Sequence, residues 1–338
     1  MRVRQLRAGL RGWGGVGAMA AVCALALAFV LLLPRTQSHG TGSPAPGGGR
    51  PAQGIQAKAD DCEDSDAQNR SLSPSSADGP TISAIRSRGY LSVGVDQNSY
   101  RWGYLNPNDS SGELEGFDID LVHRIAKDIL GSEDKVQFKA IPTNQRIEAI
   151  QSRRVDMVVR TMTITCDRLK QVAFSAPYFL TGQQVLAPKT SSVTGYDSTL
   201  AGKRICSASG STAYEDLSAD KKSGKLPASA DISTTVPNQL DCLVRLQLGE
   251  VDAVVTDGAL AASQAAQDPT VALKGSTFTK EYYGVAMRLG ADDLVRQVNR
   301  ILENYRKDGG WKASYDKWLS PTLGKDSESA TPPTASYR

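Results

Sequence analysis

Polar side chains follow two similar apolar segments of the chain. Val155-Asp156-Met157-Val158-Val159 precedes Thr161-Met162-Thr163, and Val251-Asp252-Ala253-Val254-Val255 precedes Thr256-Asp257-Gly258. Hydroxyl groups and a carboxylate in such positions can hydrogen-bond a small polar ligand. Because ligands of α/β sheets bind outside the carboxyl ends of the strands, the two segments predict two halves of one binding cleft.

Residue sets that serve catalysis or metal binding are missing from the sequence. The two histidines, His39 and His123, lie far apart, which argues against a multi-histidine metal site. There is no C-x-x-C pair for zinc or thioredoxin-type chemistry and no G-x-S-x-G motif for a serine nucleophile. The sequence therefore predicts a binding protein that uses no catalytic residue, no metal and no cofactor, rather than an enzyme.

Strand and helix patterns alternate around these segments. We expect strands over residues 90–95, 136–141 and 155–160, and helices over 117–130 and 144–152. Such alternation is typical of βαβ units with a parallel sheet, so the predicted fold class is α/β.

The valine-rich segment occurs twice, 96 residues apart, and each copy follows a short helix that opens with Asn-Gln. This shared setting favours two similar α/β lobes over one long sheet. A chain of 338 residues is long enough for two medium-sized cores.

The first 35 residues differ from the rest in charge and hydropathy. They contain five arginines and no acidic residue, and residues 12–34 are uncharged and long enough to span a bilayer. An arginine-rich flank stays cytoplasmic, so we expect residues 1–35 to be a membrane anchor or a cleaved signal and the remainder to be exported. That remainder has 34 basic and 36 acidic residues, which argues against a nucleic-acid partner.

Residues 36–80 are rich in Gly, Pro and Ser and predict a disordered linker, and residues 321–338 predict a disordered tail. Four cysteines lie beyond the N-terminal segment. An even number in an exported chain predicts two disulfides, with three connectivities open. These cysteines are Cys62, Cys166, Cys206 and Cys242.

Several motifs resemble the polar amino-acid class of bacterial extracellular solute-binding proteins, family 3. The resemblance runs from about residue 84 to Leu319 and is strongest to actinobacterial glutamate- and glutamine-binding proteins, some of which are kinase-linked sensors. The motifs, in family order, are Gly116-Phe117-Asp118-Ile119-Asp120-Leu121, Thr161-Met162-Thr163-Ile164-Thr165-Cys166-Asp167-Arg168, Phe174-Ser175-Ala176-Pro177-Tyr178, Ser209-Gly210-Ser211-Thr212 and Val251 to Asp257.

The resemblance implies a two-lobe fold of the periplasmic-binding-protein type II, with two crossovers between the lobes. Lobe 1 would comprise residues 81–187 plus 282–320, and lobe 2 residues 188–281. The lobes of this family close over the ligand like a jaw, and we expect a monomer.

The resemblance also assigns roles to the polar residues of the cleft. Arg168 has the planar donor fork that suits an α-carboxylate, and Thr163 can donate to that carboxylate or accept from the ammonium. The turn that leads into Ser211 and Thr212 offers backbone N–H groups to an anion. Asp257, helped by the carbonyl of Thr161, would bind the α-ammonium.

Side-chain specificity depends on two residues of opposite charge. Asp96 stands where family members read the ligand side chain, and a carboxylate there favours glutamine or asparagine. Arg160 or Arg101 would instead supply the cation for glutamate or aspartate. We favour the acidic ligands and keep the amides as the alternative. The aromatic shelf under the ligand would be Tyr100, Trp102 or Tyr104.

The related proteins imply pairing of Cys206 with Cys242, which leaves Cys62 for Cys166. Two functions share these ligand residues: capture for an ABC permease and sensing through a membrane signalling partner, in either case on the extracytoplasmic face of the membrane. A dehydratase-like enzyme on the same scaffold is a remote third.

Overall fold

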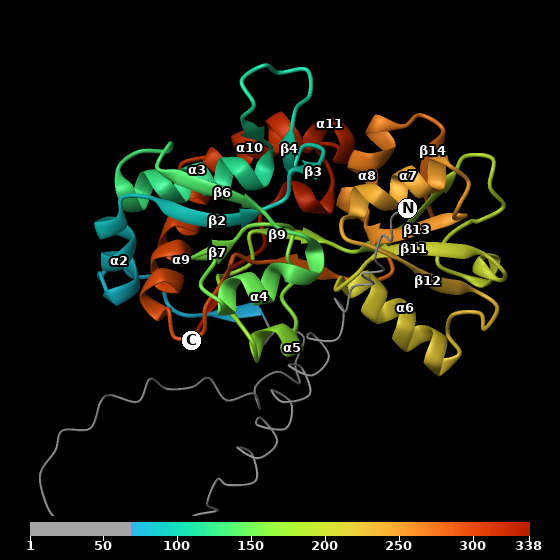
Figure 1. The fold of residues 1–338 in the computed structure, drawn as a ribbon, viewed down its shortest axis with the longest axis horizontal. Coiled ribbons are helices and arrows are strands. Elements are labelled where there is room, and N and C mark those ends of the chain that lie inside the picture. The colour runs from blue at the N-terminus through green and yellow to red at the C-terminus, as the bar shows by residue number, and fades with distance from the viewer. Residues whose placement is uncertain (1–68) are drawn as a thin grey trace, which may run out of the picture. The chain divides into compact units, whose positions relative to one another are not determined.

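The structure is a computed structural model and describes residues 69–338. Two five-stranded sheets dominate this part of the chain (Figure 1). The first has the order β6 (Val136–Ala140), β2 (Leu91–Val95), β7 (Met157–Val158), β16 (Ala286–Met287) and β8 (Ala173–Phe174). The second has the order β12 (Asp231–Val236), β11 (Arg204–Ala208), β13 (Ala253–Asp257), β10 (Gln183–Pro188) and β14 (Val271–Lys274).

Each sheet has a parallel half and an antiparallel half. In the first sheet β2 runs parallel to β6 and β7, whereas β16 runs antiparallel to β7 and β8. In the second sheet β11 runs parallel to β12 and β13, whereas β10 runs antiparallel to β13 and β14. The two lobes thus have the same plan, as the sequence repeat predicts.

Helices cover both faces of each sheet. The first lobe has α2 (Pro80–Arg88), α3 (Phe117–Leu130), α4 (Arg146–Gln151), α5 (Cys166–Leu169), α9 (Asp292–Lys307) and α10 (Gly310–Trp318), and the second has α6 (Thr212–Ser223), α7 (Gln239–Gln247) and α8 (Gly258–Gln267). Short 3-10 turns lie at η3 (Thr143–Gln145) and η4 (Ser198–Leu200).

Adjacent strand residues enter different cores, as the period of two requires. On β11, Ile205 packs with Ala213 and Leu217 of α6, whereas Cys206 packs with Leu243 of α7. The first lobe divides in the same way, into one core under α2, α3 and α9 and another under α4 and α5.

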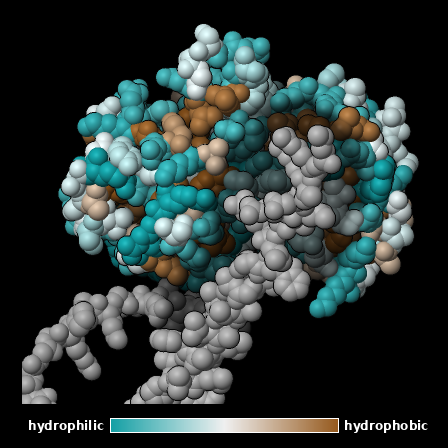
Figure 2. Space-filling view, in the orientation of Figure 1, coloured by the Kyte–Doolittle hydropathy of each residue, from teal (hydrophilic) through white to brown (hydrophobic). Residues whose placement is uncertain are grey.

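The surface is mainly hydrophilic on the face shown in Figure 2, where hydrophobic side chains form smaller patches.

The chain passes between the sheets on two strands that pair with each other. These hinge strands, β9 (Phe179–Thr181) and β15 (Glu281–Tyr283), are antiparallel. Immediately after β9 the two crossings approach closely, because a Cβ atom on Gly182 would lie 2.0 Å from the carbonyl oxygen of Thr279. A small sheet of β3 (Asn98–Ser99), β4 (Gly103–Leu105) and β5 (Leu114–Glu115) follows β2.

The local predictions agree well with the elements observed. The helix expected over 117–130 is α3, whose apolar face is buried and whose end is capped by Gly131 in the left-handed conformation. The strands expected at 90–95 and 136–141 are β2 and β6, and the helix expected at 144–152 is η3 followed by α4. The lobe boundary expected at 187 is too late, because β10 already pairs within the second sheet.

The expected disorder at residues 69–80 and 321–338 is wrong for this structure. β1 (Arg70–Ser71) pairs in parallel with β17 (Ser336–Tyr337), and α11 (Ser320–Leu323) and η5 (Glu328–Ala330) lie between α10 and β17. Polar composition misled the prediction here, because hydrogen bonds to distant groups order these segments together with limited apolar burial, such as that of Ala330 in the core of the first lobe. Ser71 donates to the carbonyl of Phe174, and Ser329 donates to that of Leu180.

The expected anchor or signal at residues 1–35 and most of the expected linker lie outside the described residues. Within residues 69–338, no helix has both the length and the apolar character to cross a membrane.

Candidate functional site

The polar residues predicted from the two strand ends lie together between the lobes. Thr161 and Thr163 follow β7, Arg168 lies in α5, and Asp257 ends β13. Ser211 caps α6 by accepting a hydrogen bond from the backbone N–H of Tyr214 at 3.2 Å. All of these ligand candidates, with Thr212, are buried. The sequence-based choice of cleft residues therefore describes one place in the molecule.

Arg168 bridges the two lobes through neutral acceptors. It donates to the carbonyl of Thr163 at 2.8 Å and, across the cleft, to the carbonyl of Gly210 at 3.2 Å. Its ion-pair partner is the exposed Glu215, whose carboxylate lies 4.0 Å away. Within residues 69–338, the ion pair of this buried guanidinium is thus a single long one, to an exposed carboxylate.

Gly210 itself is required by this close approach. Its φ of +73° is unfavourable for other residues, and an added Cβ would lie 2.9 Å from the backbone of Asn144 in the other lobe. A side chain at this position would separate the lobes, so glycine allows its carbonyl oxygen to enter the site.

Arg146 lies among these candidate residues, and the sequence analysis did not name it. Its buried guanidinium donates to the carbonyls of Thr143 at 2.9 Å, Arg160 at 3.3 Å, Thr161 at 3.4 Å and Gly210 at 3.3 Å. Burial, and then the charges of Arg168 and Arg160, hold its pKa well below the ordinary value. The only sequence signal was an arginine opening the helix before the repeated strand.

Two guanidinium groups therefore converge on one neutral oxygen. Arg146 and Arg168 both donate to the carbonyl of Gly210, and no ion pair of Arg146 with a carboxylate occurs within residues 69–338. Such a pair of donors is suited to binding carboxylate groups.

The two predicted readers of the ligand side chain pair with each other. Arg160 is fully buried and lies 2.8 Å from Asp96. It also donates to Thr143 at 2.9 Å and, in the other lobe, to Asn238 at 3.0 Å. Asp96 accepts further bonds from the backbone N–H groups of Gln97 and Asn98 and from the Ser99 hydroxyl. Each charge is thus largely satisfied by the protein.

Arg101 lies away from this pair. It donates to the carbonyl of Trp318 at 3.3 Å and stacks on Tyr100, so the structure does not bring it to the site as the expected cation.

Asp257 lies in an acidic part of the cleft. It accepts a hydrogen bond from the hydroxyl of Tyr283. Burial, and then the nearby charge of Glu281, raises its pKa to about 8, against the opposing effects of Tyr283, Arg146 and Arg168. A cation such as an ammonium group would compensate this carboxyl on ionisation.

Asp118 fixes the backbone at Thr161, whose φ of +40° is unusual for a residue other than glycine. The Asp118 carboxylate accepts from the N–H of Thr161 at 3.0 Å and from Tyr178 at 2.8 Å. Burial raises the pKa of Asp118 to about 7. The Gly116-Phe117-Asp118 motif thus fixes the backbone of the segment that follows β7.

Glu281, at the start of the hinge strand β15, is a second residue that sequence reasoning missed. Its carboxylate accepts from Thr163 of the first lobe at 2.6 Å, from Thr212 of the second at 3.0 Å, and from Gln183 at 2.6 Å. Two candidate ligand residues therefore share this one carboxylate.

Trp102 belongs to the core and not to the expected aromatic shelf. Its indole is fully buried and makes edge contacts with Phe117, Phe179 and Tyr283. Among the three aromatic candidates, Tyr100 lines a small hollow that also includes Gln239 and Leu260 of the second lobe.

The structure contains the disulfide between Cys206 and Cys242, which joins β11 to α7. Cys166 is also disulfide-bonded. Its expected partner, Cys62, lies outside the described residues.

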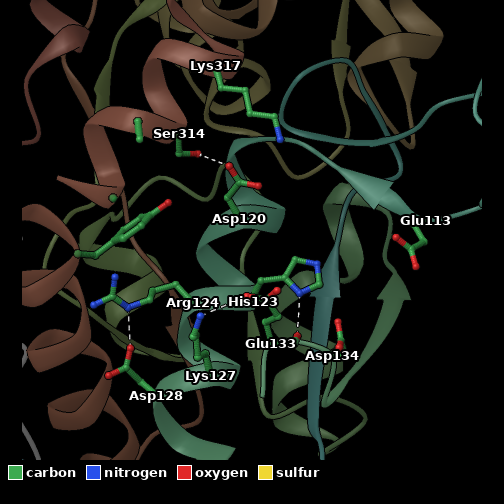
Figure 3. Close-up of a pocket in the computed structure, with 13 residues that line it drawn as sticks. Glu113, Asp120, His123, Arg124, Lys127, Asp128, Glu133, Asp134, Ser314 and Lys317 are labelled. Carbon is green, nitrogen blue, oxygen red and sulfur yellow. Dashed lines mark hydrogen bonds and ion pairs between the residues drawn. The ribbon is translucent and has the colours of Figure 1, made fainter. Parts of the chain in front are cut away.

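A second hollow on the first lobe is a wide, open groove. It measures about 860 Å³ and lies against α3 and α10. Acidic and basic side chains both line this groove, and several already have partners within it. Asp120 accepts a hydrogen bond from Ser314, and Arg124 forms an ion pair with Asp128 (Figure 3). This groove is separate from the cleft. Residues 69–338 contain no cluster of side chains suited to a metal ion.

Two α/β lobes, two hinge strands and a buried polar cleft between them define a two-lobe binding protein. The chain belongs to the bacterial extracellular solute-binding proteins, family 3, whose sequence profile matches residues 91–321. The family is one of extracellular solute-binding proteins, and the relatives that the chain matches are named as amino-acid-binding proteins.

The chain is similar to the ABC transporter glutamine-binding protein GlnH of Bacillus subtilis, with 35% identity over 239 residues, 71% of this chain and 84% of GlnH. It is 28% identical to the glutamate-binding protein GluB of Corynebacterium glutamicum over 276 residues, 78% of this chain and 89% of GluB. Among solved structures, the solute receptor for L-cysteine of Neisseria gonorrhoeae is 28% identical, with a TM-score of 0.67 over 75% of this chain and 99% of the receptor.

Proposed function

We propose that this protein binds a free acidic amino acid, L-glutamate or L-aspartate, in the cleft between its lobes. The observation that carries the proposal is the convergence of Arg146 and Arg168 on the carbonyl of Gly210, with Asp257 close enough for its pKa to respond to both charges. The two cationic forks match the two carboxylates of such a ligand, and Asp257, with Glu281 near it, matches its ammonium group.

Each ligand group has a partner in this proposal. Arg168 and the N–H groups at Ser211 and Thr212 take the α-carboxylate, and Asp257 with the carbonyl of Thr161 takes the ammonium. Arg146 takes the side-chain carboxylate, in place of Arg160 or Arg101, because Asp96 already neutralises Arg160. Asp96 and Arg160 then act as a fixed pair that helps to join the lobes.

Glutamine or asparagine is the second candidate. The 35% identity to a glutamine-binding protein supports it, and an amide would need no further cation in the cleft. Calorimetric titration of the purified chain, unfolded and refolded to remove bound ligand, with the twenty amino acids separates the two. We expect micromolar binding of glutamate or aspartate, about −8 kcal/mol.

Arg146→Gln tests the assignment directly. Loss of a charge-assisted interaction should weaken the binding of glutamate by about 2 kcal/mol, roughly thirtyfold in Kd, but the binding of glutamine by less than about threefold. Arg154→Gln, at an exposed arginine on the following loop, should change neither affinity. Equal losses for glutamate and glutamine would show that Arg146 does not read the side chain, and an absence of binding by any amino acid would refute the proposed function.

We also propose delivery of the ligand to an ABC permease, from a position anchored to the membrane by residues 1–35. The relation to an ABC transporter binding protein supports uptake, whereas none of the similar proteins described above is named as a signalling protein. Deletion in the native host should abolish high-affinity glutamate uptake. Unchanged uptake would favour sensing. N-terminal sequencing of the exported chain tells an anchor that begins at Met1 from a cleaved signal.

A further inference from the structure

Glu281 holds two ligand hydroxyls from opposite lobes. Its buried carboxylate accepts hydrogen bonds from Thr163 Oγ1 at 2.6 Å and Thr212 Oγ1 at 3.0 Å, and a third from the amide of Gln183 at 2.6 Å. All three donors are uncharged groups, and each directs a hydrogen-bonding proton towards the Glu281 carboxylate.

A hydroxyl group has a single proton and two lone pairs. Once Thr163 and Thr212 donate to Glu281, their oxygens can only accept hydrogen bonds from a ligand. Asp257, which is near enough to interact electrostatically with Glu281, is an acceptor as well. With Asp257 ionised, this corner of the cleft therefore offers acceptors and negative charge, which an ammonium group needs and a carboxylate or carbonyl does not.

We propose that Glu281 is a positioning residue that makes the cleft selective for a ligand with an α-ammonium group. Because the hydroxyl protons of Thr163 and Thr212 are already donated to Glu281, neither is available to a ligand. The cleft should therefore bind otherwise identical acids that lack the amino group more weakly. The inference rests on the proposed function, since it assumes an amino acid in this cleft. It also assigns Thr163 to the ammonium rather than to the α-carboxylate.

The test compares an amino acid with its des-amino analogue in the refolded full chain. The pairs are L-glutamate with glutarate and L-glutamine with glutaramate, measured by competition calorimetry with whichever amino acid the wild type binds. In Glu281→Gln, the new amide donates to one of the threonines and frees its proton for the ligand. We expect the ratio of the two Kd values, analogue over amino acid, to fall at least tenfold.

Glu113→Gln is the matched control, because Glu113 is exposed on the first lobe, and it should leave the ratio unchanged. In a Thr163→Val/Thr212→Val background, Glu281→Gln should alter the ratio much less, since both hydroxyls through which it acts are gone. An undiminished effect there, or a ratio within about twofold of wild type in Glu281→Gln alone, would overturn the inference while the proposed function stands.

Thr163→Val alone keeps the inference testable if Glu281→Gln does not fold. Loss of an ammonium acceptor should weaken the amino acid at least tenfold more than its analogue, whereas equal weakening would show that Thr163 donates to the carboxylate. Failure of the wild type to bind any amino acid is a different result, which would remove the proposed function and this inference together.

Discussion

Arg146 and Arg168 show how individual residues of this cleft are left incompletely satisfied. Both guanidinium groups are buried against backbone carbonyls, whereas Arg160 has a carboxylate at 2.8 Å. Hydrogen bonds to carbonyls satisfy donors but do not neutralise charge. On the acidic side, Asp257 and Glu281 accept bonds from hydroxyl and amide donors. The separation of these charges within one cleft is what a zwitterionic ligand would complement.

Asp257 gives the cleft a pH dependence. Because burial and Glu281 raise its pKa to about 8, the empty folded protein keeps a proton on Asp257 that the unfolded chain loses near pH 4. Its contribution to the free energy of unfolding is therefore greatest at low pH and is lost as pH rises towards 8. Binding of an ammonium group requires the ionised carboxylate, so ligand binding below pH 8 should release a proton.

We expect the affinity to rise between pH 6 and 8, by at most about tenfold per pH unit. Calorimetry in two buffers of different ionisation enthalpy measures the released proton. Asp257→Asn should bind weakly at all these pH values and release no proton. A wild type whose affinity and proton balance do not change with pH would contradict the assignment of Asp257 to the ammonium.

At the scale of elements, the site depends on the ends of strands and on the first turns of helices. Thr161 and Thr163 follow β7, Asp257 ends β13, and Thr212 begins α6. Hydrogen bonds from neighbouring residues fix these positions. The backbone N–H of Thr161, for example, donates to the Asp118 carboxylate at 3.0 Å. In the second lobe, the disulfide between Cys206 and Cys242 ties β11, an internal strand of the sheet, to α7.

Removal of this disulfide should destabilise the protein without changing the ligand contacts. The bridge closes a loop of 36 residues, for which the chain-entropy estimate is about 3–4 kcal/mol. Urea unfolding of a Cys206→Ala/Cys242→Ala double variant, compared with wild type, measures the loss. An unchanged unfolding midpoint would show that packing of β11 on α7 alone stabilises this lobe.

At the scale of the whole molecule, the C-terminal segment connects distant parts of the chain. Residues 324–338 pass the hinge strand β9, where Ser329 donates to Leu180 at 2.7 Å, and end beside β1, where Arg338 donates to the carbonyl of Ser71 at 2.9 Å. Ala330 is buried in the core of the first lobe. The segment thus links the hinge to the point where the described chain begins.

Truncation after Gly324 should therefore lower thermal stability by several degrees. We expect a loss of about 2 kcal/mol from the buried alanine and from the backbone groups left unpaired, which lowers Tm by roughly 3–4 °C at an unfolding entropy of about 2.1 cal/mol/K per residue. Scanning calorimetry tests it. An unchanged Tm in the truncated chain would show that residues 325–338 do not stabilise the fold.

The sequence by itself determined most of the elements and the residues of the candidate site that the fold brings together. Helix 117–130, the strands at β2 and β6, and the two polar strand ends all follow from patterns within a few residues, because hydrophobic period and capping are local properties. The family motifs then located Arg168, Thr163 and Asp257 in one cleft. Composition, in contrast, wrongly predicted disorder for residues 69–80 and 321–338.

Only the tertiary structure decided which charges neutralise each other. Asp96 and Arg160 are 64 positions apart and were read as rival ligand contacts, yet they form a buried pair. Arg146 and Glu281 have no distinctive local signal, and they enter the site because the lobes and hinge strands bring distant segments within hydrogen-bond distance. Pairing of buried charges depends on distances in space, which a linear pattern of residue types does not contain.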